Sequence, residues 1–412
     1  MSQEKKRRAQ RAASSGTPLS PRVKSRDPVK NKENPQVKLR AGFSKEYILS
    51  AVEGVYPERS RRARDDNHNK KRVVRWLRQV AIVVLCAIFI FSAASYGVAR
   101  WYQHTQAGEP FQTGVTFIPS YANYLGVNPW QTLQALLDDL GVRQFRLVSY
   151  WDEIEVSPGI YDFNQLDWQF KAIENAGGTV SLAVGLRQPR WPECHAPSFY
   201  DTQRPREQWQ PQLEAFMSAV VNRYKTSPAL VSYQLENEFF NQFGACYNFD
   251  RQRLADEKTL LKKLDREHPV IISRSNNYAG FALRGPLGDI NGISLYRRVW
   301  DAAVTKRYQT YPFPSWHYAA LAGVQQLLKG QHSVLHELQM EPWPPHGKNI
   351  RDVDLAEQNK SFDAERFRST LAFATQTGIR HRDLWGAEYW YYRWKVLGDD
   401  SVWREARVAF RN

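Results

Sequence analysis

Two glutamates carry side chains that could do paired acid–base chemistry. Glu238 follows an apolar run that ends at Leu235, and Glu337 follows the apolar pair Val334-Leu335 about 100 residues later. Two carboxyl groups can divide the work of breaking a glycosidic bond, because one protonates the leaving oxygen while the other attacks the sugar or activates a water. The residue types and their spacing therefore suggest hydrolytic chemistry on a sugar.

A third glutamate competes for one of these roles. Glu341 lies four residues after Glu337 and has the same parity in an extended strand. Four residues of strand span roughly 13 Å, so only one of the two can sit at the depth of Glu238. Glu341 precedes Pro342 and is expected in a loop. We expect Glu337 to react and keep Glu341 as the alternative.

Short apolar runs are the elements that would place these glutamates. Eight of them are predicted as strands, and they span Gly114–Ile118, Gln144–Ser149, Thr179–Gly185, Leu230–Leu235, Val270–Ser273, Gly292–Tyr296, Ser333–Glu337 and Arg382–Ala387. Amphipathic patterns between them predict helices over Trp130–Leu140, Asp167–Ala176, Pro211–Lys225, Arg251–Glu267 and His317–Lys329.

Strands that alternate with helices over this length favour an α/β fold, the (β/α)₈ TIM barrel, over residues 111–412. An open dinucleotide-binding sheet would need a glycine-rich turn after its first strand, and Ile118-Pro119-Ser120 is not one. The fifth helix must be stunted, because the stretch GFALRGPLGDI between the fifth and sixth strands is too short for a full one. In such a barrel the fourth and seventh strand ends, where Glu238 and Glu337 lie, face each other across the mouth.

The net charge of +15 is concentrated outside the predicted barrel. Residues 1–78 hold 22 basic and 8 acidic side chains, whereas the other 334 residues hold 35 and 34. The tail is rich in Lys, Arg, Ser, Pro and Asn without an apolar period, so we predict that it is disordered and cytoplasmic. The nearly neutral remainder argues against nucleic-acid binding by the folded domain.

An uncharged run of 20 residues, 80–99, matches the thickness of a bilayer. Arg78 and Arg100 bracket it, and Trp76 and Trp101 lie at the expected interfaces. We predict a transmembrane helix over 79–100 and a linker over 101–110. The basic excess before the span would keep the N-terminus in the cytoplasm and place the barrel outside. A buried core helix and a cleavable signal peptide are the alternatives, and the long basic region argues against the peptide.

Three cysteines are present, and Cys86 falls inside the predicted span. Cys194 and Cys246 are then the only pair in the exported part, where disulfides persist. We predict that they are bridged, with two free thiols as the alternative. Cys/His zinc patterns are absent from the sequence, so no metal or cofactor is expected.

Two stretches carry a resemblance to a known group. The run VSYQLENEF, which contains Asn237-Glu238, resembles the strand-four motif of β-galactosidase-type enzymes, and LVSYWDEIEVSPGIYDFNQLD resembles the segment after strand two in the same clan. This clan comprises cellulase- and β-galactosidase-like retaining glycoside hydrolases with catalytic glutamates on strands four and seven. The resemblance covers roughly residues 112–412 and identifies no family within the clan.

The resemblance implies a role for each matching residue. Glu238 looks like the acid/base and Glu337 like the nucleophile. Arg146 is similar to the arginine that keeps the nucleophile ionised. The other implied substrate-binding residues are Asn237 for the sugar 2-hydroxyl, Tyr296 beside the nucleophile, Trp385 or Trp390 under the sugar ring, and Trp191 in a neighbouring loop.

We therefore expect a membrane-anchored extracytoplasmic glycosidase or transglycosylase that acts on an oligo- or polysaccharide and contacts the lipid bilayer through residues 80–99. A barrel that binds glycan without cleaving it is the main alternative, and it would not need both carboxylates. An adaptor that works through the basic tail is a further alternative, but it would leave the barrel unexplained. The sequence does not specify the sugar or the oligomeric state.

Overall fold

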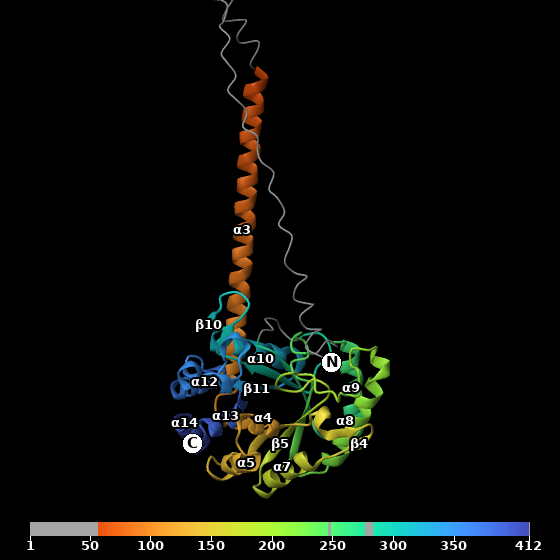
Figure 1. Ribbon diagram of the computed structural model, residues 1–412. Helices are drawn as coiled ribbons and strands as arrows, with labels where there is room; N and C mark the ends of the chain where they lie inside the picture. Colours follow the sequence, from red (N-terminus) through yellow and green to blue (C-terminus); the bar gives the residue numbers. More distant parts are fainter. Residues whose placement is uncertain (1–56, 246–248, 277–282, 412) are drawn as a thin grey trace, which may run out of the picture. The chain divides into compact units, whose positions relative to one another are not determined.

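The computed structural model describes residues 57–245, 249–276 and 283–411. The chain divides into two compact units, Met1–Ala81 and Ile82–Asn412 (Figure 1). The second unit contains the closed sheet and everything discussed below as the site.

Eight parallel strands close into a barrel in the order β1-β12-β11-β8-β7-β6-β5-β2. Each predicted strand is found, with bounds that shift by at most two residues. The predicted (β/α)₈ barrel is therefore confirmed. The strands are β1 (Gln112–Thr116), β2 (Gln144–Val148), β5 (Thr179–Val184), β6 (Leu230–Leu235), β7 (Val270–Arg274), β8 (Ile290–Leu295), β11 (Ser333–Gln339) and β12 (His381–Trp385).

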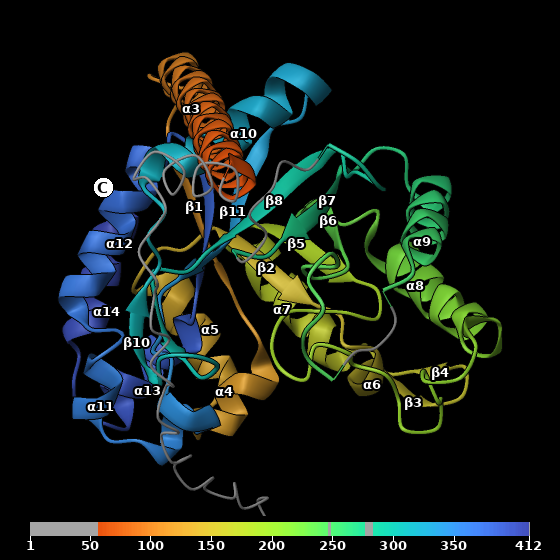
Figure 2. The same ribbon diagram turned by 90° about the horizontal axis from the view of Figure 1, so that it is seen from above.

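Helices surround the sheet, as the view from above shows (Figure 2). Their buried faces carry apolar residues at helical spacing, for example Leu133, Leu136 and Leu137 on α5. These helices are α4 (Pro119–Leu125), α5 (Pro129–Asp138), α6 (Trp151–Ile154), α7 (Asn164–Asn175), α8 (Gln210–Tyr224), α9 (Arg251–Leu264), α10 (Ser315–Lys329), α11 (Leu355–Asn359), α12 (Ala364–Thr377), α13 (Ala387–Lys395) and α14 (Ser401–Arg411).

Two small hairpins interrupt the strand–helix alternation. Strands β3 (Glu155–Ser157) and β4 (Ile160–Tyr161) pair after β2, and β9 (Arg298–Asp301) and β10 (Arg307–Thr310) pair after β8. Short 3₁₀ turns cover Arg206–Gln208, Pro345–Gly347 and Ile350–Asp352. Between β7 and β8, none of the described residues is helical, in keeping with the short fifth connection.

The helix that contains the apolar run, α3 (Pro57–Thr105), is longer than predicted at both ends. Residues 57–78, assigned to the disordered tail, are helical because no glycine or proline interrupts the chain from Glu58 to Tyr96. Residues 101–105, assigned to the linker, continue the same helix. Its part from Asn69 to Thr105 is long and apolar enough to cross a membrane. Residues 1–56 of the predicted tail lie outside the described part of the chain.

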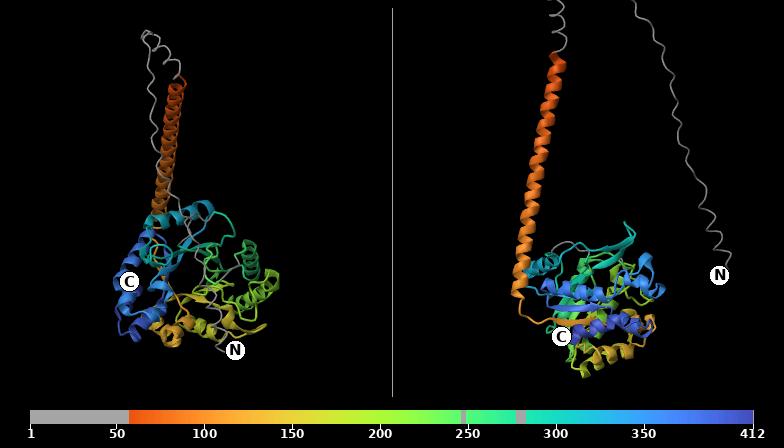
Figure 3. Two further views of the ribbon diagram at one scale, coloured as in Figure 1. Left: turned by 45° about the horizontal axis from the view of Figure 1, so that its top comes forward. Right: turned by 90° about the vertical axis from the view of Figure 1, so that its left-hand side faces the viewer.

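The last turns of α3 belong to the same compact unit as the barrel and contact it. Ala99 and Tyr102 are buried, and the side-chain amide of Gln103 donates to the carbonyl of Gln376 at 2.7 Å. Gly323 of α10 permits this approach, since a Cβ there would lie 2.8 Å from Val98. Figure 3 shows the same ribbon from two further sides.

Candidate active site

The end of β6 is held in a tight conformation that places Glu238. Glu236 and Glu238 have positive φ angles of 57° and 42°, which side chains with a Cβ rarely adopt. The carboxylate of Glu236 accepts hydrogen bonds from the backbone N–H of Leu186 at 2.6 Å and pairs with Arg253 at 2.9 Å. Glu236 thus fixes the turn and is not free for chemistry.

Glu238 projects from this turn into a nearly water-free environment. It is only 5% exposed, and its backbone N–H donates to the hydroxyl of Ser273 on β7 at 3.0 Å. Burial, together with the negative charge of Glu337, raises the pKa of Glu238 to about 7. A carboxyl group with such a pKa is protonated below neutral pH and can serve as an acid.

Glu337 lies where β11 departs from regular pairing. The register with β8 shifts between Leu335 and Glu337, which leaves His336 as the extra residue of a bulge. Bulges of this kind redirect side chains near functional sites. The carboxylate of Glu337 accepts from Arg146 of β2 at 2.9 Å and from the hydroxyl of Tyr296 at 2.9 Å. The structure therefore brings Arg146, Tyr296 and Glu337 together.

Arg146 is the hub of a buried polar network. Its side chain is completely buried, and besides Glu337 it donates to the side-chain oxygen of Gln234 at 2.6 Å and to that of Asn237 at 3.0 Å. It also donates to the carbonyl of His336 at 3.0 Å. An arginine fixed by several acceptors holds its positive charge in a defined position, here against the carboxylate of Glu337.

Asn237 joins this network to another acid. Its amide donates to Glu193 in the loop after β5, at 3.0 Å. Arg187 lies 3.7 Å from the same carboxylate, and burial raises the pKa of Glu193 well above its ordinary value. Three buried carboxyl groups, those of Glu193, Glu238 and Glu337, thus interact electrostatically in the site. Only two were expected from the sequence.

Glu341 occupies a separate cluster. It pairs with Arg190 at 3.2 Å and accepts hydrogen bonds from the hydroxyl of Tyr121 at 3.1 Å and the indole N–H of Trp385 at 2.8 Å. Arg190 also lies over the Trp385 ring, 4.4 Å from its centroid. Glu341 is therefore held by its own partners, apart from the Arg146 network.

Of the tryptophans proposed to contact sugar, Trp390 does not reach the site. It is fully buried, its indole N–H donates to the carbonyl of Met340, and it packs against Phe367. This assignment is wrong because Gly386 ends β12 and starts α13, whose inner face carries Trp390 into the core. Trp385 is 6% exposed and partly covered by Arg190, whereas Trp191 is 71% exposed and open to a ligand.

Cys194, three residues after Trp191, is disulfide-bonded. Cys86, in α3, is a free thiol. The predicted partner of Cys194, Cys246, lies outside the described residues, so the pairing stays a prediction. The loop that carries Cys194 also supplies Arg190 and Glu193, both with positive φ angles.

Several residues of the site gave no usable signal in the sequence. Glu193 and Arg190 lie in an irregular loop, and only the closed barrel brings them to the strand ends. The sequence could have indicated Gln234 as a site residue, since it has the same parity along β6 as Glu236 and Glu238. His336, buried against Asp383 with a 2.6 Å hydrogen bond, has its pKa lowered to about 4, chiefly by burial.

No protein-family model matches the sequence. Among solved structures, the chain is similar to endo-glycoceramidase II from Rhodococcus sp., with 13% identity, a TM-score of 0.42, and coverage of 67% of this chain and 72% of that chain. It is also similar to a GH5_18 protein from Bifidobacterium longum subsp. infantis, with 14% identity and a TM-score of 0.46. That match covers 67% of this chain and 69% of the other. A third similar structure is Gan42B, a GH42 β-galactosidase from G. stearothermophilus, with 13% identity and a TM-score of 0.48. That match covers 74% of this chain but only 56% of the other, little more than half of its length. At these identities the similarity is one of fold.

Proposed function

We propose that the protein is a retaining glycoside hydrolase or transglycosylase that is anchored in a membrane through residues 80–99. The observation that carries this proposal is that two buried glutamates, Glu337 and Glu238, have different electrostatic surroundings. Glu337 receives a cation and a phenol, whereas Glu238 has a pKa raised to about 7. Two buried carboxyl groups in unlike surroundings, one paired with a cation and one with a raised pKa, are typical of a nucleophile and an acid.

In the proposed first step, the ionised carboxylate of Glu337 attacks the anomeric carbon while Glu238 gives its proton to the leaving oxygen. The bond to the leaving group breaks and a glycosyl ester forms on Glu337. In the second step Glu238, now ionised, takes a proton from water or from a sugar hydroxyl, whose oxygen displaces Glu337. This sequence requires the two carboxyl groups to lie about 5–5.5 Å apart.

The surrounding residues have supporting roles in this proposal. Arg146 and Tyr296 orient the carboxylate of Glu337, and Arg146 supplies a positive charge beside it. Asn237, which is 2% exposed and bonded to Arg146 and Glu193, is poised to turn its amide toward a sugar 2-hydroxyl. Trp191 offers an exposed ring against which the C–H face of a sugar can pack.

The membrane part of the proposal rests on the helix from Asn69 to Thr105 and on the charge distribution around it. The basic residues before the apolar run would remain in the cytoplasm, which places the barrel on the outer side. A glycosidase so placed would act on glycans outside the cell.

The test uses the full-length chain, purified in detergent, against a panel of 4-nitrophenyl glycosides and natural oligosaccharides. The Glu337→Gln variant, nearly identical in shape, is the control for contaminating activity. Hydrolysis by the wild-type chain that the variant lacks supports the proposal. The anomer released first, followed by NMR, must keep the configuration of the substrate. Release of the inverted anomer would contradict retention.

A further inference from the structure

A cavity of about 770 Å³, a volume typical of small-molecule sites, is lined by segments that follow β8 and β11, and β11 is the strand that carries Glu337. Its walls come from the β9–β10 hairpin, the segment 345–354 and α11. Two links connect these walls to the site. Arg298 lies two residues after Tyr296, and Trp343, in the loop that leads to the cavity, contacts Tyr296 edge-on with ring centroids 5.6 Å apart.

The strand ends are coupled to the cavity wall by one glutamine. The side-chain oxygen of Gln339, the last residue of β11, accepts from the backbone N–H groups of Arg297 and Arg298 at 2.8 and 2.9 Å. Its amide donates to the carbonyl of Arg298 at 2.7 Å. The cavity wall is therefore fixed with respect to the strand that carries Glu337. A glycan bound at Glu337 would meet this cavity as it extends along that side of the mouth.

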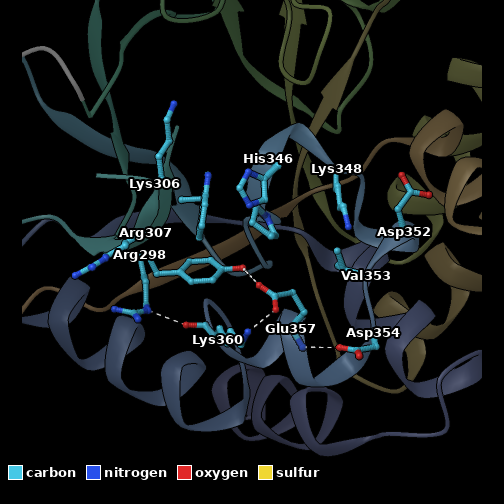
Figure 4. A pocket seen from close by; sticks show the side chains of 13 residues that line it. Arg298, Lys306, Arg307, His346, Lys348, Asp352, Val353, Asp354, Glu357 and Lys360 are labelled. Carbon is cyan, nitrogen blue, oxygen red and sulfur yellow. Dashed lines mark hydrogen bonds and ion pairs between the residues drawn. The ribbon is translucent and has the colours of Figure 1, made fainter. Parts of the chain in front are cut away.

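The cavity is lined by more cations than anions. Five basic side chains contribute to it, Arg298, Lys306, Arg307, Lys348 and Lys360, and Figure 4 shows them spread around its rim together with His346. Three acidic side chains, Asp352, Asp354 and Glu357, lie on the same wall.

Each of the three acids accepts a hydrogen bond from a neighbouring group, but within the described chain only Glu357 is paired with a cation, so the five basic side chains outweigh the three acidic ones by two charges. Asp352 accepts from the side-chain amide of Asn349 at 2.9 Å, and Asp354 caps α11 by accepting from the backbone N–H of Glu357 at 2.7 Å. Glu357 itself accepts from the hydroxyl of Tyr308 at 2.9 Å and pairs with Lys360. By contrast, Lys306, Arg307 and Lys348 form no ion pair with any carboxylate among the residues that the structure describes. Their charge is available to a ligand.

Aromatic rings complete the cavity. The ring of Trp300 lies 5.1 Å from that of Tyr308 and 4.7 Å from that of His346, measured between centroids. The indole N–H of Trp300 has no acceptor within the described part of the chain. Rings provide surfaces for the C–H faces of sugars, and unpaired cations provide the complement of a negative charge.

We propose that this cavity is a glycan subsite that recognises an anionic group, a carboxylate or a phosphate, on a sugar next to the one that reacts. This inference rests on the proposed function, which it deepens by naming the substrate class as acidic glycan. Arg307 and Lys348 supply the charge, and Trp300 with Tyr308 supplies the stacking surface.

The test measures binding with the full-length chain in detergent, in the Glu337→Gln background so that no ligand is consumed. The probes are a galacturonate hexamer, its fully methyl-esterified neutral form, and N-acetylglucosamine 1-phosphate. We expect at least one charged probe to bind, with an affinity that falls as NaCl is raised. If that probe is the galacturonate hexamer, its neutral ester should bind at least tenfold more weakly.

A double charge reversal, Arg307→Glu with Lys348→Glu, should reduce the affinity for the charged probe at least tenfold. The matched control is Lys171→Glu with Lys263→Glu, which changes the net charge equally at exposed lysines on α7 and α9. Equal loss in both double variants, no binding of either charged probe, or a galacturonate hexamer that binds no better than its neutral ester while the sugar phosphate does not bind, would overturn the inference. Thermal melts of both variants exclude unfolding as the cause of a loss.

Failure of this inference can be told apart from failure of the proposed function. A wild-type chain that cleaves neutral glycosides but binds neither charged probe contradicts the subsite and leaves the glycosidase proposal in place. A chain that cleaves no glycoside but binds a charged probe through Arg307 and Lys348 supports the binding site and contradicts the catalytic proposal.

Discussion

Arg146 and Glu337 lie 191 residues apart in the sequence, yet their side chains are 2.9 Å apart at the mouth of the barrel. Both are buried, so the pair is poorly screened by water. The same arginine contacts Asn237, the neighbour of Glu238. The Arg146 guanidinium therefore connects the ends of β2, β6 and β11. It pairs with Glu337 and not with Glu238, so the two carboxyl groups have different electrostatic surroundings.

Removing one of the two partners of Glu337 should weaken activity without unfolding the protein. The Tyr296→Phe variant loses a single hydrogen bond to a charged group, which is worth about 1.5–3 kcal/mol. We expect kcat to fall about 10- to 100-fold and the melting temperature to change little. Arg146→Met should also lower the melting temperature, because it leaves a buried carboxylate without its cation. Unchanged kcat in Tyr296→Phe would show that the phenol does not act on the reacting group.

The raised pKa of Glu238 predicts a pH dependence. The acid must be protonated, so kcat/KM should fall as pH rises through about 7. Between 4.5 and 7 the folded protein holds a proton that the unfolded chain has lost, so this group makes stability fall as pH rises. Glu238→Gln should therefore raise the melting temperature at pH 8 more than at pH 4. A larger gain at pH 4 would contradict the assignment.

Replacing Glu337 and Glu341 one at a time shows which of the two is the nucleophile. Glu337→Gln should be inactive. Glu341→Gln should keep measurable turnover but melt earlier, since Arg190 loses its anionic partner. The two variants differ from the wild-type chain by the same chemical change, so each is the control for the other. Activity in Glu337→Gln with none in Glu341→Gln would move the nucleophile to Glu341 while leaving the mechanism intact.

The proposed orientation can be tested in intact cells with epitope tags at both ends of the chain. Protease added outside should remove a C-terminal tag and spare an N-terminal one, because in the proposed orientation the basic residues before the apolar run keep the N-terminus inside. Cells opened by detergent should lose both tags, which controls for resistant tags. If intact cells lost the N-terminal tag and kept the C-terminal one, the orientation would be opposite to the one proposed.

The sequence predicted the barrel well because its strands are buried on both faces and stand out as apolar runs. It also predicted which strand ends meet, since parallel order in a closed barrel fixes that geometry. The end of β6 illustrates the point, because Leu230–Leu235 has the same bounds in the sequence analysis and in the structure.

Residues in irregular loops were not predictable in the same way. Glu193 and Arg190 reach the site through a loop with positive φ angles, a conformation that no periodicity encodes. Trp390 was misplaced for a related reason, since an LWGAEYWYY run reads as an extended strand until Gly386 starts a helix. The helical residues before the apolar run 80–99 were missed because a polar helix lacks an apolar stripe.

The most direct test of the account compares Glu238→Ala and Glu337→Ala on an activated aryl glycoside, with and without sodium azide. With a good leaving group the acid is dispensable, so Glu238→Ala should still form the glycosyl-enzyme, stall there, and regain turnover when azide attacks from the vacated side. The product should be a glycosyl azide with the configuration of the substrate. Glu337→Ala should lose several kcal/mol of catalysis, at about tenfold in rate per 1.4 kcal/mol, because no covalent intermediate can form. A Glu337→Ala variant as active as the wild-type chain, or a Glu238→Ala variant that azide does not restore, would contradict the double-displacement mechanism with these two residues.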